Sequence, residues 1–102
     1  MSNTQRLIWL PEAAEDLVRL REFIAPENPA AAKRAAQRIQ SGVQILIDNP
    51  DAGKPLDDGT ERRELYLPFG AGTYVLRYRL HGTTVVVVRV WHSRESRTDS
   101  SK

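Results

Sequence analysis

The sequence contains no cysteine and only two histidines, His81 and His92, in 102 residues. The missing cysteines exclude disulfides, thiolate metal sites and a cysteine nucleophile. With two histidines, a histidine-rich zinc site is not expected either. No apolar run approaches the roughly 18 residues that a membrane-spanning helix needs, and the polar residues 1–6 do not resemble a secretion signal. We therefore expect a soluble, cytoplasmic protein without cofactors and without contact to a membrane.

The length corresponds to one small domain, residues 1–102. A fraction of 40% hydrophobic and 27% charged residues is typical of a folded globular chain. A chain of this length buries enough surface to fold without covalent crosslinks. The polar residues 93–102 are predicted to form a flexible C-terminal tail.

Positive charge is concentrated late in the sequence. Residues 62–97 contain seven arginines against two glutamates, whereas residues 1–61 contain seven Lys/Arg against ten Asp/Glu. Guanidinium groups bind carboxylates and phosphates through two parallel hydrogen bonds. A GC-rich genome would explain arginine in place of lysine, but not this concentration. The distribution predicts that the C-terminal third contacts an anionic partner, either nucleic acid or an acidic protein segment.

The first half of the chain is predicted to form a strand and two helices. Residues 5–10 form a short apolar strand that ends before Pro11, which suits the first turn of a helix. Apolar residues at helical spacing continue that helix through position 24 (Ala13, Leu17, Leu20 and Ile24). Asn28 is a plausible N-cap for a second helix that begins at Pro29 and ends before Pro50. Its early alanines predict close approach of the two helices as an antiparallel hairpin.

After a turn-like segment, residues 51–61, the pattern changes to the alternation of strands. Three strands are predicted, over residues 62–67, 73–80 and 83–91, with a tight turn at His81-Gly82. The valine run 85–88 indicates a strand near the centre of the sheet, covered on both faces. The fold is thus predicted to be α+β, with order β-α-α-β-β-β. The helical hairpin packs on a curved, mostly antiparallel four-stranded sheet.

Alternation also assigns side chains to the two faces of the sheet. Arg77 and Arg79 fall on the polar face of their strand. In the last strand, the even-numbered valines 86, 88 and 90 alternate with a set that includes Arg89 and Trp91. Arg63 shares the parity of leucines 65 and 67 and points to the covered face. There it needs an acidic partner or a groove, and structural and functional explanations stay open.

Other polar and aromatic residues have ordinary structural interpretations. Asp16 and Arg19 are read as part of a solvated, charge-rich helix face. Trp9 and Trp91 are read as core or interface anchors. His92 follows the last strand, where it either caps the sheet or carries a proton beside Arg94.

Six short patterns in this order resemble the RelE/ParE superfamily of toxins from bacterial type II toxin–antitoxin, or plasmid stabilisation, modules. The resemblance spans about residues 5–97. The patterns are Trp9-x-x-x-Ala13-x-x-Asp16-Leu17, Asn28-Pro29-x-Ala31-Ala32, Leu46-x-x-x-Pro50-x-x-Gly53, Arg63-Glu64-Leu65, Tyr74-Val75-Leu76-Arg77-Tyr78-Arg79 and Val88-x-Val90-x-His92-x-Arg94.

The resemblance implies a growth-arresting toxin held inactive by a ParD-like antitoxin in a hetero-oligomer. RelE-like members are ribosome-dependent mRNA endonucleases, and by position Arg63, His92 and Arg94 match residues of that catalytic set. ParE-like members instead inhibit DNA gyrase. No tyrosine follows Tyr78, and Lys54 is the one lysine in the loop before Arg63. These departures favour the ParE-like, non-enzymatic interpretation, with the nuclease as the alternative. Target or antitoxin binding is then assigned to Arg63, Arg77, Arg79, Arg89, Trp91, His92, Arg94 and Arg97.

Overall fold

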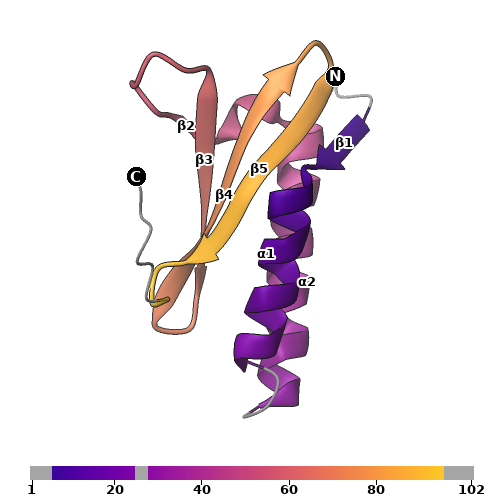
Figure 1. Cartoon of the computed structure of the whole chain (residues 1–102), viewed down its shortest axis with the longest axis vertical. Coiled ribbons are helices and arrows are strands. Elements are labelled where there is room, and N and C mark those ends of the chain that lie inside the picture. Colours follow the sequence, from indigo (N-terminus) through magenta and orange to yellow (C-terminus); the bar gives the residue numbers. More distant parts are fainter. Residues whose placement is uncertain (1–5, 25–27, 96–102) are drawn as a thin grey trace.

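A computed structural model describes residues 6–24 and 28–95, although not the side chains of residues 23 and 24. Two helices lie against one face of a twisted sheet (Figure 1). The helices are α1 (Pro11–Ile24) and α2 (Pro29–Asp48), followed by a short 3₁₀ helix at Pro50–Ala52. The strands are β1 (Arg6–Trp9), β2 (Lys54–Pro55), β3 (Arg62–Phe69), β4 (Gly72–His81) and β5 (Thr84–His92). The predicted α+β class and the order of the main elements are confirmed.

The sheet has five strands, not the predicted four, in the order β1-β5-β4-β3-β2. β1 runs parallel to β5, and the other neighbours are antiparallel. The additional strand, β2, has only two residues and lies within a segment rich in glycine, proline and aspartate. Such a composition is typical of turns, so no alternation was present to reveal it.

Local signals place the helices as predicted. The side chain of Asn28 accepts a hydrogen bond from the backbone N–H of Ala31 at 3.0 Å, which confirms the N-cap. Of the predicted apolar stripe on α1, Ala13 and Leu20 are buried. The side chain of Ile24 lies outside the described residues. On α2 the buried positions recur at helical spacing: Ala35, Ile39, Gly42, Val43 and Leu46.

The core lies between the helices and the sheet. β4 contributes Tyr74, Leu76 and Tyr78, none of which is exposed, and β3 contributes Leu67. α2 approaches the sheet closely, since a Cβ added at Gly42 would lie 2.5 Å from a methyl carbon of Leu67. The helix-facing side of β4 therefore forms the centre of the core.

β5 does not follow the predicted alternation. A register shift near Arg77 and Tyr78 pairs Arg77 with Arg89 but Tyr78 with Val87, so β5 has an extra residue at Val88. This β-bulge places Val87 and Val90 on the same, helix-facing side, and both are fully buried. The predicted assignment of alternate side chains to the two faces of the sheet therefore holds only on one side of the bulge.

β5 continues into a turn at residues 93–95. The backbone N–H of Ser93 donates to the Thr73 carbonyl at 2.8 Å, and its hydroxyl accepts from the Thr73 N–H at 2.9 Å. Residues 96–102 of the predicted tail, including Arg97, lie outside the described residues.

Candidate functional site

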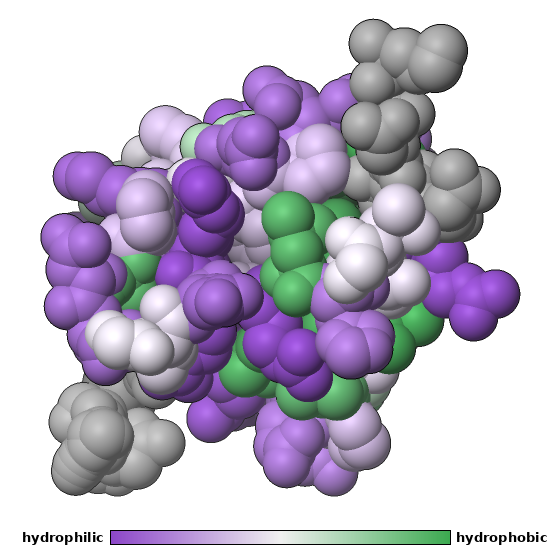
Figure 2. Space-filling model, turned by 90° about the horizontal axis from the view of Figure 1, so that it is seen from above, coloured by the Kyte–Doolittle hydropathy of each residue, from purple (hydrophilic) through white to green (hydrophobic). Residues whose placement is uncertain are grey.

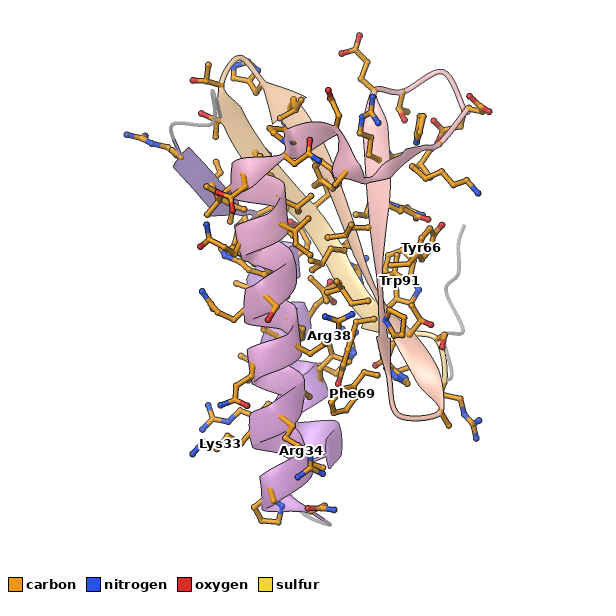
Figure 3. The ribbon with its side chains drawn as sticks, turned by 180° about the vertical axis from the view of Figure 1, so that it is seen from behind. Lys33, Arg34, Arg38, Tyr66, Phe69 and Trp91 are labelled. Atoms are coloured by element: carbon orange, nitrogen blue, oxygen red, sulfur yellow. The ribbon has the colours of Figure 1, made fainter. Side chains whose placement is uncertain are left out.

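The sheet face turned away from the helices carries a polar and aromatic cluster, Glu64, Tyr66, Arg77 and Trp91. Arg77 donates to one carboxylate oxygen of Glu64 from Nε at 2.9 Å and from Nη2 at 2.7 Å. Tyr66 donates to the other oxygen at 2.7 Å. The Arg77 guanidinium also lies over the Trp91 ring, 5.0 Å from its centroid. Figure 3 shows Tyr66 and Trp91 on the side of the sheet away from α2.

This cluster changes the role expected for Arg77. Its charge is neutralised by Glu64, which is 7% exposed, so Arg77 is not a free cation for an anionic partner. The Glu64 carboxylate, together with burial, raises the pKa of the Tyr66 hydroxyl. The Trp91 ring and the half-exposed Tyr66 instead give this face an aromatic surface.

A second network joins α1 to the edge of β5 and is centred on Asp16. Its carboxylate accepts from Arg89 Nε at 2.7 Å, from the Val90 N–H at 2.8 Å and from Arg19. Arg19 donates to the Val90 carbonyl at 3.2 Å and to Glu95 at 2.7 Å. β1 pairs with β5 only up to Val87. Beyond that residue, the backbone N–H and carbonyl of Val90 on the edge of β5 form hydrogen bonds with the α1 side chains Asp16 and Arg19 instead.

The prediction of a solvated helix face is therefore wrong for Asp16, which is 2% exposed. Burial alone would raise its pKa, but hydrogen bonds from Arg89, Val90 and Arg19 outweigh burial and hold that pKa below its usual range. Spacing within one helix could not reveal this, because Arg89 and Val90 lie more than 70 residues further along the chain. Arg89, like Arg77, is thus paired with an internal carboxylate.

Arg63 lies near the β2 end of the sheet. It shares the helix-facing side of β3 with Leu67, as predicted. Its Nη1 donates to the Gly53 carbonyl at 2.7 Å and to the Asp51 carbonyl at 3.3 Å, and its Nη2 lies 3.9 Å from the Asp51 carboxylate. The sequence predicted either an acidic partner or a groove for Arg63, and backbone carbonyls provide most of its contacts instead. That end of the molecule is covered mainly by hydrophilic residues (Figure 2).

His92 and Arg94 lie together at the opposite end of β5. The Arg94 N–H donates to His92 Nδ1 at 3.2 Å, and His92 Nε2 lies 3.4 Å from the Phe69 carbonyl. His92 Nδ1 is thus the acceptor for the turn that follows β5, and the Nε2 side of the ring faces the end of β3. The His92 ring also packs edge-on against Tyr74, with centroids 4.7 Å apart. His92 therefore has the contacts of a residue that caps the end of the sheet.

The nuclease-type residues do not converge. Arg63 pairs with Tyr78 across β3 and β4, whereas His92 pairs with Tyr74 across β4 and β5. Four residues of extended β4 separate these positions, a distance of about 13 Å. Arg79 and Arg94 have exposed side chains, and neither forms an ion pair within residues 6–24 and 28–95.

Sequence reasoning did not find a groove between the two helices, which we call the hairpin groove. Its volume is about 930 Å³, and it lies between the C-terminal half of α1 and the N-terminal half of α2. Tyr74 lines it from the sheet. Burial raises the pKa of the Tyr74 hydroxyl, which stays protonated, yet this hydroxyl has no hydrogen-bond partner in the described part of the chain. In the sequence, the alanines at helical spacing on α2 gave the one indication of this groove, because their small side chains leave room between the helices.

Within the described ranges, no three His, Cys, Asp or Glu side chains are grouped so that they could hold a metal ion. None of the helices described there has the length and apolar character needed to cross a bilayer.

Comparison with known proteins gives the family. Residues 7–97 match the family model described as the ParE toxin of the type II toxin–antitoxin system parDE. Toxin RelE3 of Caulobacter vibrioides is 40% identical over 87 residues, which cover 85% of this chain and 92% of that toxin.

Two solved structures have the same fold. A chain of the chromosomal ParDE toxin–antitoxin system of P. aeruginosa matches with a TM-score of 0.72 and 26% identity, covering 89% of this chain and 98% of that one. A chain of the toxin–antitoxin complex RelBE2 of Mycobacterium tuberculosis matches with 0.52 and 25%, covering 88% and 92%. The chain belongs to the ParE toxin family, within the RelE/ParE superfamily of toxins from type II toxin–antitoxin systems.

Proposed function

We propose that this toxin arrests growth by inhibiting DNA gyrase in the cytoplasm, without cleaving RNA, and that a ParD-like antitoxin neutralises it in a hetero-oligomer. The ParE toxin family model and the likeness to a ParDE chain support this proposal. Fold likeness alone does not select a target, so the proposal depends on the geometry of the candidate catalytic residues.

The observation that carries the proposal is the separation of Arg63 from His92 and Arg94. Cleavage of RNA by its 2′-hydroxyl needs a base, an acid and cations around one phosphate, each within hydrogen-bond reach or one water of the reacting atoms. Along the sheet, the backbone of Arg63 lies about 13 Å from that of His92, and Arg94 follows His92 in the turn after β5. The Arg63 guanidinium lies on the Gly53 carbonyl and the His92 ring lies near the Phe69 carbonyl, so the two groups do not face one phosphate in this arrangement.

The contacts of His92 also support a function without RNA cleavage. Its Nδ1 accepts from the Arg94 N–H, and its Nε2 faces the Phe69 carbonyl. A proton carrier needs one ring nitrogen open to substrate. Here each ring nitrogen faces a backbone group of this chain.

We assign target binding to the sheet face away from the helices. Arg79 is exposed there on the strand that carries Arg77, and Arg94 is exposed in the turn that follows β5. The Trp91 ring, under the Arg77 guanidinium, and Tyr66 provide the apolar part of this surface. Arg77 and Arg89 then position neighbouring groups, because each is paired with an internal carboxylate.

The alternative function, an mRNA endonuclease, has one specific observation in its favour, which is that the matching curated relatives are named RelE toxins. It predicts codon-dependent cuts in mRNA on translating ribosomes. It further predicts that His92→Ala and Arg63→Ala each abolish those cuts.

The test compares two assays on the purified chain. Gyrase supercoiling should be blocked at micromolar protein, or cleaved DNA should accumulate, whereas mRNA on translating ribosomes should stay intact. Arg79→Glu should weaken gyrase inhibition by about tenfold or more, because it reverses an exposed charge on the proposed contact face. Arg6→Glu, an exposed reversal on β1, is the matched control and should retain full inhibition. Unaffected gyrase together with cuts that need His92 would overturn the proposal.

A further inference from the structure

The turn that follows β5, residues 93–95, is fixed by hydrogen bonds at the end of the sheet. The Glu95 N–H donates to the His92 carbonyl at 2.9 Å and closes the turn. Ser93 forms two further hydrogen bonds with the backbone of Thr73 on β4, at 2.8 and 2.9 Å. The turn therefore has a defined place against the start of β4.

The side chain of Glu95 joins this turn to α1, and we call its contacts the α1 latch. The carboxylate accepts from Arg19 Nε at 2.7 Å and from Arg19 Nη2 at 3.1 Å, which is the two-bond geometry of a guanidinium on a carboxylate. It also accepts from the His92 N–H at 3.0 Å. The Glu95 side chain is 8% exposed. Burial would raise the pKa of Glu95, but these hydrogen bonds outweigh burial and lower it, so the carboxylate is charged near neutral pH.

Arg94 lies between these fixed residues. Its N–H donates to His92 Nδ1 at 3.2 Å. A Cβ added at Gly72 would lie 2.8 Å from Arg94 Cγ, and Gly72 is not among the glycines with a positive φ, so its missing side chain provides room for the Arg94 stem. The Arg94 side chain is exposed and forms no ion pair within residues 6–24 and 28–95. Its stem is thus held in place while its charge faces solvent.

The α1 latch is not needed to attach α1 to the sheet. Asp16 already joins α1 to β5 through Arg89 and the Val90 N–H. Val90 is also the last fully buried residue of β5, so the latch acts beyond the end of the core. Because Arg19 is 43% exposed, its ion pair with Glu95 contributes little to the stability of the whole domain. The effect of the latch is therefore local, on the order of the turn that carries Arg94.

We propose that Arg19 and Glu95 are positioning residues for target binding, which hold the turn so that Arg94 meets an anionic group of the target in a fixed place. Binding then does not have to order the turn, because the latch has ordered it in the free toxin. The guanidinium of Arg94 can bind a carboxylate or a phosphate through two parallel hydrogen bonds. This inference rests on the proposed function and adds how one of its contact residues is held in place.

A double-mutant cycle on gyrase inhibition tests the route through Arg94. Glu95→Ala should raise the toxin concentration for half inhibition about three- to tenfold, because the turn must then be ordered on binding. Arg94→Ala should raise it about tenfold or more, and the double variant should be no weaker than Arg94→Ala alone. Glu95→Gln should lie between wild type and Glu95→Ala, since its amide oxygen still accepts a hydrogen bond. Glu15→Ala removes an exposed carboxylate from α1 and is the matched control, with inhibition like the wild type.

The order of the turn is measured on the free toxin, without any target. In ¹⁵N relaxation, the backbone order parameters of residues 93–95 should be near the rigid value of about 0.85 in the wild type and fall below about 0.6 in Glu95→Ala. The urea midpoint should change little, because the latch lies beyond the core. A residue with a purely structural role would lower that midpoint and leave inhibition by the folded toxin unchanged.

The source of the anion is found by measuring toxin binding to gyrase with and without DNA. A weaker Kd of Arg94→Ala for gyrase alone assigns the anion to a carboxylate of that enzyme. A weaker Kd for the gyrase–DNA complex only assigns it to a phosphate. An Arg94→Ala variant that binds both like the wild type would overturn the contact.

The outcomes separate this inference from the proposed function. A turn that is as ordered in Glu95→Ala as in the wild type would overturn the latch. Unchanged inhibition by Glu95→Ala, or a loss that adds to that of Arg94→Ala, would overturn its role in target binding. A wild-type toxin without effect on gyrase would overturn the proposed function itself, and the order parameters would still decide whether Arg19 and Glu95 hold the turn.

Discussion

Substitution of Asp16 by asparagine tests the network that joins α1 to β5. The carboxylate is 2% exposed and accepts hydrogen bonds from Arg19, from Arg89 and from the Val90 N–H. Asparagine has nearly the same shape but carries no charge, and its NH₂ group would face the arginine donors. The variant therefore leaves two guanidinium groups without their shared counter-ion.

The size of the effect follows from how far each partner is buried. Breaking a fully buried ion pair costs about 3–5 kcal/mol. Arg19 and Arg89 have side-chain exposures of 43% and 34%, so solvent partly compensates the lost contacts. We expect Asp16→Asn to lower the free energy of unfolding by about 2–4 kcal/mol, a large part of the roughly 5–15 kcal/mol typical of such a domain.

The same network predicts a dependence on pH. The pKa of Asp16 is lowered in the folded chain because hydrogen bonds from Arg89, Val90 and Arg19 outweigh the raising effect of burial. A lowered folded-state pKa gives stabilisation that is complete above the unfolded pKa of about 4. It is lost as the pH falls through the folded pKa. The difference in stability between wild type and Asp16→Asn should therefore be constant near pH 7 and shrink below about pH 4.

Urea unfolding followed by circular dichroism measures both effects. Glu15→Gln removes the neighbouring carboxylate, which is exposed, and should change stability by less than about 0.5 kcal/mol. The reasoning is refuted if Asp16→Asn is as stable as this control at pH 7. It is also refuted if the difference between wild type and variant grows on acidification.

Two further substitutions test local features of the fold. Gly53→Ala should lower the free energy of unfolding in urea by about 1–3 kcal/mol. The new Cβ would lie 2.5 Å from the hydroxyl oxygen of Tyr78, and two hydrogen bonds hold that hydroxyl in place. Stability equal to that of the wild type would contradict this close approach. Asn28→Ala should cost about 1 kcal/mol through loss of the α2 N-cap, whereas retained stability would mean that the 3.0 Å bond to the Ala31 N–H contributes little.

Much of the fold could be predicted, because its signals are local. The helix start at Asn28-Pro29 depends on the chemistry of adjacent residues, and so does the tight turn, in which Gly82 has a positive φ. The turn was predicted at His81-Gly82 and lies one residue later, at Gly82-Thr83, because His81 is the last residue of β4 and pairs with Thr84. Two features of the sheet had no such signal. β2 is two residues long, and the bulge at Val88 inserts one residue into an all-valine run, so both depend on register with a neighbouring strand.

The candidate site was predicted less well, and for a related reason. Sequence reasoning counted the arginines of the C-terminal third as available to an anionic partner. Arg77 and Arg89 are instead neutralised by carboxylates that come from β3 and α1. Arg79 and Arg94 have no such partner in the described ranges, and their binding role stays a prediction.

The sequence by itself determined the two helices, the four longer strands, their order and the family, because apolar periodicity, caps and short motifs act over a few residues. Only the tertiary structure decided which charges are paired, which tyrosine hydroxyl has a partner and where the groove opens. Those properties depend on pairs of side chains far apart in the chain. Glu64 lies 13 residues from Arg77 and meets it through the pairing of β3 with β4, whereas Asp16 lies 73 residues from Arg89 and meets it only when α1 packs on β5.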